Sequence, residues 1–502
     1  MPISFNSIPA GWRVPLFYAE IDPSQAGRGT IDQPALLFGV MLSAGTATAD
    51  VPIPISSTAA AKAAFGAGSM LTRMVKTFLA NNVSSELICL PQTEPSGGQK
   101  ASGTLEFSGP ASAAGTLSLY IAGQRLQIAV ADEDTATEVG DAVEAAVTAA
   151  ADLPVAASNT DGTVTLTAKW KGETGNDIHV GVNLGGDLAG EALPAGIGVT
   201  ITAMTGGTSA PDLANSIAAL GDEPYEHVAF PYTDTTSLNA IDAEFGFGDA
   251  GRWGWLRQLY GHVWSAKRGT QGELTTFGNA RNDAAISVLG YPAARPSPPW
   301  EIAAAYAAQA AKGYGNDPAR PLQTLPLLGI MAEPRENRFS GTERNTLLYD
   351  GIATSKVMSD GTVQIERAIS TYQKNAYDQA DTAYLDTTTL ATLAYVLRDL
   401  RSAVTSKYPR HKLADDGTKF GAGQKIVTPS VAAGEIVARY AELELQGQVE
   451  NMRSFKANLV VERSVTEPNR LDALYPPDLV NQLRLFATLA QFRLQYANDV
   501  GA

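Results

Sequence analysis

The side chains best suited to acid–base chemistry in this sequence are histidines, and they lie far apart. The chain has four of them, at His179, His227, His262 and His411. His227 and His262 fall on two stretches that we predict to be core strands, so folding could bring them together. Asp222 or Asp242 could then orient a histidine that activates a serine nucleophile. The simpler interpretation, which the sequence favours, is that both histidines are core residues without a catalytic role.

The motifs that commonly carry enzymatic chemistry are missing from the sequence. No serine lies in a G-x-S-x-G elbow, and neither a G-x-x-x-x-G-K-[ST] phosphate loop nor an H-E-x-x-H pair occurs. Residues 65–69, Phe-Gly-Ala-Gly-Ser, lack the lysine of a phosphate loop. We interpret them as a tight turn whose last residue, Ser69, caps the following helix.

Two other clusters also have structural explanations. Asp132, Glu133 and Asp134 could bind a metal ion, but they precede a predicted helix, where the positive end of the helix dipole favours carboxylates. The aromatic side chains between residues 252 and 264 could stack on bases or sugars. Because no basic partners converge on them, we assign them to the core. We therefore expect no catalytic residue, no cofactor and no metal site.

Composition describes an acidic globular protein. The chain has 502 residues, enough for roughly three domains of about 150 residues. With 44% hydrophobic and 18% charged residues it resembles a folded protein and not a disordered one. The net charge of −15 argues against direct nucleic-acid binding, which needs clustered Lys and Arg. The single cysteine, Cys89, lies in an apolar run and is interpreted as a small core residue.

The lengths of the apolar runs and the first residues of the chain indicate where in the cell the protein is expected. No apolar run reaches the eighteen or so residues that a membrane span needs, so we expect no membrane insertion. The first twelve residues lack the basic start and apolar core of a secretion signal. Both observations predict a protein that is made and kept in a cytoplasm.

Hydrophobic periodicity predicts an α/β core that a second domain interrupts. We expect strands at 35–41 and 86–90, with helices at 56–64 and 70–79 between them, so the two strands should be parallel. After residue 211 the pattern resumes with helices at 212–220, 279–285 and 300–312 and strands at 227–230, 261–266 and 286–291.

The interrupting segment, 95–210, is rich in Ala, Gly and Thr and is predicted to be an inserted β-rich domain. Its one helix, 135–151, begins with a capping box of Thr135 and Glu138 and buries three valines. The buried valines are Val139, Val143 and Val147, and the predicted strands are 103–107, 116–121, 125–131, 163–170 and 198–203.

The C-terminal region should combine strands with two long helices. A turn at 359–361 precedes a strand at 363–372. The first helix is capped by Asp386 or Thr387 and buries one apolar face as far as Val404. The second starts at Thr428, a cap that is followed by proline. Apolar and polar residues alternate from 455 to 463, which predicts a further strand.

The last fifty residues contain an apolar segment that the rest of the chain cannot easily cover. Prolines at 476 and 477 prevent a helix interior or central strand there. The spacing beyond them slightly favours a helix, although a strand buried on both faces would look similar. The segment either docks on its own domain or is donated to a neighbouring subunit. Its apolar residues, the subunit-interaction candidates, are Leu483, Leu485, Phe486, Leu489, Phe492 and Leu494.

The stretch from 14 to 21 is a second candidate arm, because Pro15 fits only an edge strand or the start of a strand. Its candidate interaction residues are Val14, Leu16 and Tyr18.

Several stretches resemble the tail sheath proteins of contractile-tailed bacteriophages, in particular the Mu-like type. The resemblance covers nearly the whole chain and is weakest in the insert. It is carried by Ile-Pro-Ala-Gly-Trp-Arg-Val-Pro at 8–15, Phe-Tyr-Ala-Glu at 17–20, Phe-Gly-Ala-Gly-Ser at 65–69, residues 367–372, Tyr-Leu-Asp-Thr at 384–387 and residues 468–483.

The resemblance implies a mixed α/β (α+β) fold class: an α/β core with subtilisin-like topology but no working triad, an outward insert, a C-terminal α/β domain that faces the tail tube, and terminal arms that add strands to neighbouring subunits. The corresponding divisions are 1–25 for the N-terminal arm, 26–94 and 211–338 for the core, 95–210 for the insert, 339–475 for the tube-facing domain and 476–502 for the C-terminal arm.

The function implied is that of a non-enzymatic structural subunit. Many copies would form a helical sheath around the tail tube protein, with baseplate and tail terminator proteins as further partners. The assembly would be built in the host cytoplasm, belong to the virion and contract to drive the tube through the host envelope. Two alternatives stay open at this point: a hydrolase or nucleotide-using enzyme on the same α/β core, and a static surface-layer or capsid component.

Overall fold

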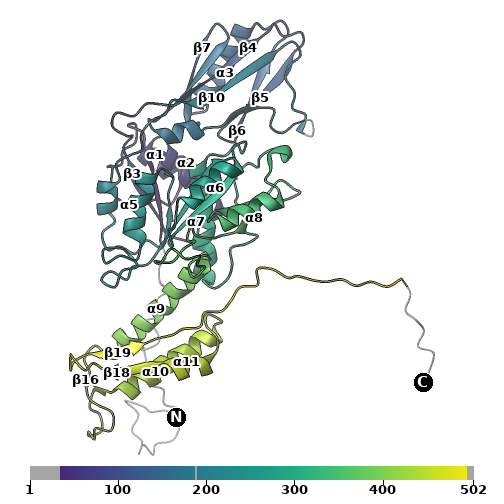
Figure 1. Cartoon of the computed structure of the whole chain (residues 1–502). Helices are drawn as coiled ribbons and strands as arrows, with labels where there is room; N and C mark the ends of the chain where they lie inside the picture. Colours follow the sequence, from purple (N-terminus) through teal and green to yellow (C-terminus); the bar gives the residue numbers. More distant parts are fainter. Residues whose placement is uncertain (1–33, 187–188, 495–502) are drawn as a thin grey trace, which may run out of the picture.

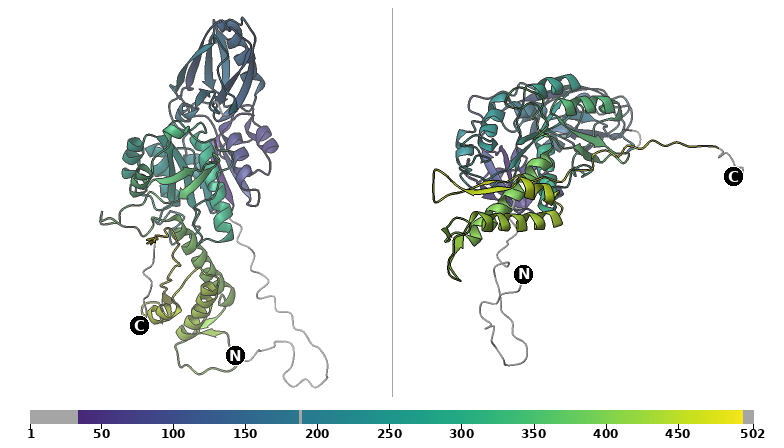
Figure 2. Two further views of the ribbon diagram at one scale, coloured as in Figure 1. Left: turned by 90° about the vertical axis from the view of Figure 1, so that its right-hand side faces the viewer. Right: turned by 60° about the horizontal axis from the view of Figure 1, so that its bottom comes forward.

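The computed structural model describes residues 34–186 and 189–494, and the fold is a mixture of helices and sheets, as predicted. Three bodies are stacked along one direction in Figure 1: the insert, a central body built on a large sheet, and a mainly helical C-terminal body. The long helix α9 (Thr387–Lys407) joins the central and C-terminal bodies. Figure 2 shows the same stacking from a second side.

The central body contains an eight-stranded sheet in the order β15-β14-β13-β12-β11-β1-β3-β2. The six strands from β14 to β3 run parallel, and the two edge strands, β15 and β2, are antiparallel to their neighbours. The strands are β1 (Ala35–Val40), β2 (Ile53–Pro54), β3 (Leu87–Gln92), β11 (His227–Ala229), β12 (His262–Gly269), β13 (Ile286–Pro292), β14 (Ala353–Val357) and β15 (Val363–Arg367).

The two faces of this sheet bury different clusters, because successive side chains of a strand point to opposite faces. Ala35 and Leu37 of β1 join the cluster that contains α2 (Met70–Asn81) and α7 (Pro299–Asn316), whereas Leu36 and Phe38 join the cluster on the other face. Helix α7 is alanine-rich and buried on nearly all sides. It is therefore the central packing element of the molecule.

Shorter helices complete the central body. Ser57 caps α1, and Ser69 caps α2 as predicted. The shorter helices are α1 (Thr58–Phe65), α4 (Ala214–Ala218), α5 (Thr235–Phe245), α6 (Gln271–Asn279) and α8 (Gly341–Tyr349).

The insert consists of two small antiparallel sheets around α3 (Ala136–Ala149). The predicted capping box of Thr135 and Glu138 is present, and the three valines of α3 are buried. One sheet has the order β10-β4-β8-β7 and the other β6-β5-β9. The strands are β4 (Ser102–Ser108), β5 (Gly115–Ile121), β6 (Gln124–Val130), β7 (Val155–Thr160), β8 (Thr163–Ala168), β9 (Val180–Val182) and β10 (Gly198–Thr205).

The C-terminal body has a core of its own, in which the rings of Tyr440 and Phe455 stack with centroids 3.6 Å apart. Helix α10 starts after the cap Thr428, as predicted. The elements after α9 are β16 (Lys412–Leu413), β17 (Ile426–Val427), α10 (Pro429–Leu445), α11 (Met452–Asn458), β18 (Val460–Arg463) and β19 (Leu471–Leu474).

Three sequence predictions were wrong in part. Residues 280–285 are not helical, because the helix lies earlier as α6, whose capping box is Thr270 and Glu273. The alternation from 455 to 463 is a strand only from Val460; Phe455 belongs to α11 and packs on α10. The strand predicted for 363–372 ends at Arg367.

The core sheet also extends beyond residue 338, where the sequence analysis ended the core domain. Strands β14 and β15 form a hairpin around the predicted turn at residues 359–361, and β14 pairs with β13. Residues 353–367 therefore complete the central sheet instead of starting the C-terminal body.

Candidate subunit interface

The two histidines singled out in the sequence do meet. His227 of β11 and His262 of β12 are directly paired in register, and both side chains are buried. Both rings also lie against Trp264, with centroids 6.2 Å and 4.5 Å from it. Among the described residues, neither nitrogen of either ring has a hydrogen-bond partner.

The surroundings of this pair fit a core and not a catalytic centre. Loss of hydration on burial lowers the pKa of both His227 and His262 to about 3, so they stay neutral. The side chain of Asp222 is 83% exposed and pairs with Arg257. Burial, followed by the charge of Asp283, raises the pKa of Asp242 to about 6. The predicted carboxylate partners thus do not orient either histidine.

The other clusters that could carry chemistry serve the fold. Ser69 accepts the Thr72 amide as the helix cap, in a turn where Gly66 and Gly68 have positive φ. The Asp134 carboxylate accepts the Ala131 amide at 2.6 Å. In the described parts of the chain, no group of three or more His, Cys, Asp or Glu is arranged to hold a metal ion. No described helix is long and apolar enough to cross a membrane.

The aromatic run around residue 253 is mostly internal. Arg252 is fully buried, donates to Glu244 at 2.8 Å and lies over the rings of Tyr225 and Phe245. Trp255 is the exception, because 68% of its surface is exposed.

The start of the C-terminal segment is held against the body by contacts of Leu479 and Arg484. Leu479 forms a β-bridge with Val449. Arg484 then pairs with Asp386, the N-cap residue of α9, at 3.1 Å. Asp386 also pairs with Arg367 at the end of β15, so one carboxylate connects the central sheet, α9 and the start of the segment.

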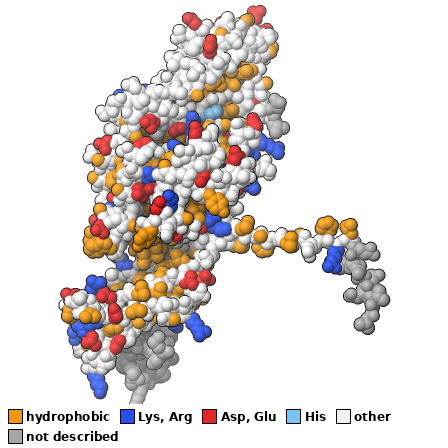
Figure 3. Space-filling model, viewed as in Figure 1, with side chains coloured by type: hydrophobic (Ala, Val, Ile, Leu, Met, Phe, Trp, Pro, Cys, Tyr) orange, Lys and Arg blue, Asp and Glu red, His pale blue; other side chains and the backbone are white. Residues whose placement is uncertain are grey.

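Beyond Arg484 the segment up to Leu494 runs as an extended chain away from the body (Figure 1). Within this single chain it forms neither of the two predicted elements, a helix or a strand. Figure 3 shows its hydrophobic side chains standing free along the chain. The exposed fractions are 71% for Leu483, 81% for Leu485, 82% for Phe486, 88% for Leu489, 83% for Phe492 and 95% for Leu494.

The structure also contains a strand pair with free edges. β18 and β19 form a two-stranded antiparallel sheet, and no other described strand pairs with either of them. Val460 and Leu474 stand opposite each other in this pair and are 47% and 63% exposed. Sequence reasoning missed this pair as a possible acceptor, because α11 was assigned to a strand. The candidates of the N-terminal arm, Val14, Leu16 and Tyr18, lie outside the described residues.

Comparisons with known proteins match nearly the whole chain. Residues 96–218 match the phage tail sheath protein beta-sandwich domain, 206–371 the phage tail sheath protein central domain, and 379–493 the phage tail sheath C-terminal domain. The Mu-like prophage FluMu tail sheath protein of Haemophilus influenzae is 43% identical over 496 residues, which cover 98% of this chain and 100% of the relative.

Two solved structures are more distant. The sheath tail protein of Desulfitobacterium hafniense aligns with 93% of this chain and 100% of its own, with a TM-score of 0.46 and 11% identity. The sheath tail protein of Listeria innocua aligns with 89% of this chain and 92% of its own, with a TM-score of 0.48 and 11% identity. The three family matches and the extensive identity to the Haemophilus relative show that the chain belongs to the phage tail sheath protein family.

Proposed function

We propose that this chain is the repeating subunit of a contractile tail sheath, and that its C-terminal arm, residues 485–494, joins each copy to the next. The observation that carries the proposal is the row of exposed apolar side chains on a segment that is anchored at Arg484 and uncovered beyond it. Fully burying a Leu or Phe side chain stabilises an assembly by about 1.5–3 kcal/mol. An arm with such a row of side chains is therefore suited to binding a neighbouring molecule.

Strand addition is the mode of binding that suits this arm. An extended segment can supply main-chain hydrogen bonds to a free sheet edge, each contributing about 0.5–1.5 kcal/mol net. The β18–β19 pair offers such edges, and its exposed Val460 and Leu474 would gain apolar neighbours. A two-stranded sheet is only marginally stable alone, so added strands would also stabilise the acceptor.

The anchored base supports donation to a neighbour over docking on the chain's own domain. Hydrogen bonds and an ion pair join Leu483 and Arg484 to Gln323, Asp386 and Thr388 at the base of the arm, whereas the apolar side chains beyond Arg484 are largely exposed. A head-to-tail contact of this kind generates a helical array when the rotation between successive copies does not close into a ring.

The stacking of the three bodies supports an orientation within the sheath. The insert and the C-terminal body lie at opposite ends of the molecule. With the C-terminal body against the tail tube, the insert would face outward. The tube, baseplate and tail terminator proteins are the partners this arrangement calls for, with assembly in the host cytoplasm before incorporation into the virion. The subtilisin-like description of the core and the role of the N-terminal arm remain predictions.

Contraction requires subunit contacts with two packings separated by a barrier, while a flexible connection keeps the copies joined. An arm that is fixed at one end and paired at the other meets this requirement. The bodies can then rotate while the arm contacts persist.

The direct test is a truncation after Arg484, which keeps the Leu479 bridge and the Arg484–Asp386 pair. We expect a monomer with unchanged melting temperature that forms no cylinders by electron microscopy, whereas the full chain forms hollow cylinders. Cylinders from the truncated chain would contradict the arm's role. Planar arrays from the full chain would favour a surface layer, and dispersed particles with turnover would favour an enzyme.

A further inference from the structure

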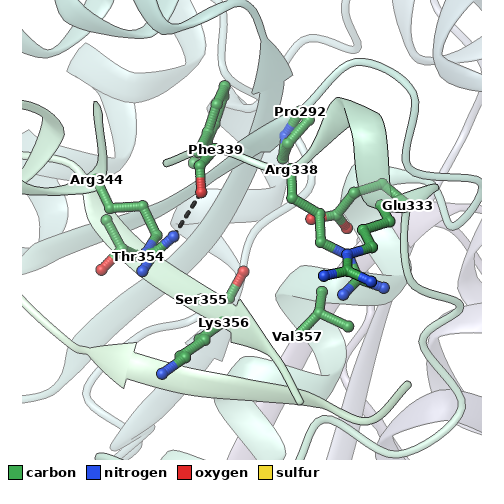
Figure 4. A pocket seen from close by; sticks show the side chains of 11 residues that line it. Pro292, Glu333, Arg338, Phe339, Arg344, Thr354, Ser355, Lys356 and Val357 are labelled. Atoms are coloured by element: carbon green, nitrogen blue, oxygen red, sulfur yellow. Dashed lines mark hydrogen bonds between the residues drawn. The ribbon is translucent and has the colours of Figure 1, made fainter. Parts of the chain in front are cut away.

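The central body contains a cationic cavity that the arm does not involve. It measures about 250 Å³ and lies where β13 ends, between β14 and the turn that leads into α8. Ligand sites of α/β sheets commonly lie at the carboxyl ends of parallel strands. Figure 4 shows Arg344 and Lys356 on one side of the cavity and Arg338 on the other. The charged side chains that line it are Glu333, Arg335, Arg338, Arg344 and Lys356.

The acidic groups at this cavity already have partners. Glu333 accepts the Arg295 Nε–H at 2.7 Å, and both residues are almost fully buried. Arg344 donates to Glu366 at 2.8 Å. Among the described residues, Arg335, Arg338 and Lys356 have no ion pair; Arg335 and Lys356 are exposed to solvent, and Arg338 is half-buried.

Arg338 is the most informative of the three. Its side chain is half-buried, and its buried Nε has no hydrogen-bond partner in the described part of the chain. Burying a charged donor without a partner is costly. A guanidinium group binds carboxylates with two parallel hydrogen bonds, so a carboxylate in the cavity would remove this cost.

From these contacts we infer that the cavity accepts an aspartate or glutamate side chain from a second copy of this chain. The inference rests on the proposed assembly, which brings copies against one another. A second copy can supply such a carboxylate, because each chain has 52 acidic against 37 basic residues. The cavity is smaller than the roughly 300–1,000 Å³ of sites for drug-sized ligands, which fits a single side chain.

The first test changes the charge of the cavity and measures assembly. Arg338→Gln should leave the melting temperature of the monomer unchanged or slightly raised, because the Arg338 side chain has no hydrogen-bond or ion-pair partner among residues 34–186 and 189–494. We expect the protein concentration needed for cylinders to rise about tenfold, the effect of losing one charge-assisted hydrogen bond. Arg320→Gln, at an exposed arginine outside the cavity, is the matched control and should change neither quantity.

The second test identifies the occupant. Carbodiimide activation of carboxyl groups in assembled cylinders should couple the Lys356 amine to an acidic peptide of this same chain. The coupling should be absent from monomers at equal concentration and from Lys356→Arg cylinders. Coupling to the tube protein alone would overturn the inference, as would wild-type-like assembly of Arg338→Gln with no coupling at Lys356.

The two proposals can fail separately. If the wild-type chain forms cylinders, and neither Arg338→Gln nor the coupling at Lys356 shows an effect, the proposed function stands. The inference that the cavity accepts a side chain of a second copy is then refuted. If the wild-type chain forms no cylinders, the proposed function and the second-copy occupant fall together. Glutarate, added to the monomer at constant ionic strength, then reports on the cavity itself: a rise in melting temperature that Arg338→Gln abolishes would show a carboxylate site, and no rise would exclude one.

Discussion

Trp170 of the insert packs edge to face against Trp300 of α7, with ring centroids 5.5 Å apart and planes at 79°. Both side chains are fully buried, and a single hydrophobic cluster extends from the insert into the central body. The insert is thus attached through a shared core and not only through its two chain junctions.

This contact predicts a large effect of Trp170→Ala on stability. Removing a buried Trp side chain costs about 3–5 kcal/mol, because its apolar contacts are lost and a cavity remains. We expect that loss in the free energy of unfolding measured with denaturant. Trp255→Ala, at a tryptophan that is 68% exposed, is the control and should change stability little. Equal effects of the two substitutions would contradict the shared core.

A buried ion pair at the same junction predicts a second effect. Arg73 of α2 donates to Glu301 of α7 at 2.5 Å and to the Ala122 and Asp152 carbonyl oxygens of the insert, both at 3.0 Å. Arg73→Met would leave the buried Glu301 carboxylate unpaired, at a cost of about 3–5 kcal/mol.

The matched variant is Arg73→Met combined with Glu301→Met, which removes both charges. It should recover much of the lost stability, because similar apolar replacements of buried pairs are often nearly neutral. A double variant that is no more stable than Arg73→Met would show that the hydrogen bonds to the insert, and not the unpaired charge, dominate.

Local sequence signals predicted the elements whose ends carry caps and whose faces are apolar. Ser69, Thr135 and Thr428 each precede the helix they were expected to start. The failures occurred where distant packing decides the structure. Phe455 alternates like a strand residue but stacks on Tyr440, which lies in another helix.

The same difference between local signals and distant packing applies to the candidate sites. The sequence indicated that His227 and His262 could meet, because both lie on adjacent strands of an α/β pattern. The sequence could not show the Trp170–Trp300 contact, because these two residues lie over a hundred positions apart. It could not show the cationic cavity either, because the lining side chains come from segments that are several tens of residues apart. A deletion of residues 99–209 would expose Trp300 and remove two acceptors of Arg73.

The histidine pair predicts a pH dependence of stability. The folded pKa of both His227 and His262, about 3, lies below the unfolded value of about 6.5. The unfolded chain therefore binds more protons, so stability is full above pH 6.5 and falls as the pH drops toward 3. Each histidine should cost about 2 kcal/mol at pH 5 relative to pH 7.

Denaturant unfolding at pH 7 and pH 5 tests this prediction. Replacing both histidines by Phe should reduce the pH dependence without preventing cylinder formation. Part of the slope should remain, because burial also lowers the pKa of His179 to about 4. Normal stability and normal cylinders combined with a lost tail function in the double variant would reopen a catalytic interpretation of the pair.

The final prediction concerns Leu489, which is 88% exposed near the middle of the arm. Leu489→Pro removes one backbone donor and obstructs strand pairing while keeping most of the arm's apolar surface. Because Leu489 and the other apolar side chains of the arm are largely exposed, the monomer should keep its melting temperature while cylinder formation is lost. Leu489→Ala should weaken assembly less, and Leu445→Ala, at a leucine that is 90% exposed outside the arm, should not weaken it. A destabilised, aggregating Leu489→Pro monomer would indicate that the arm docks on its own domain, and normal cylinders from this variant would show that strand pairing by the arm is not what joins the subunits.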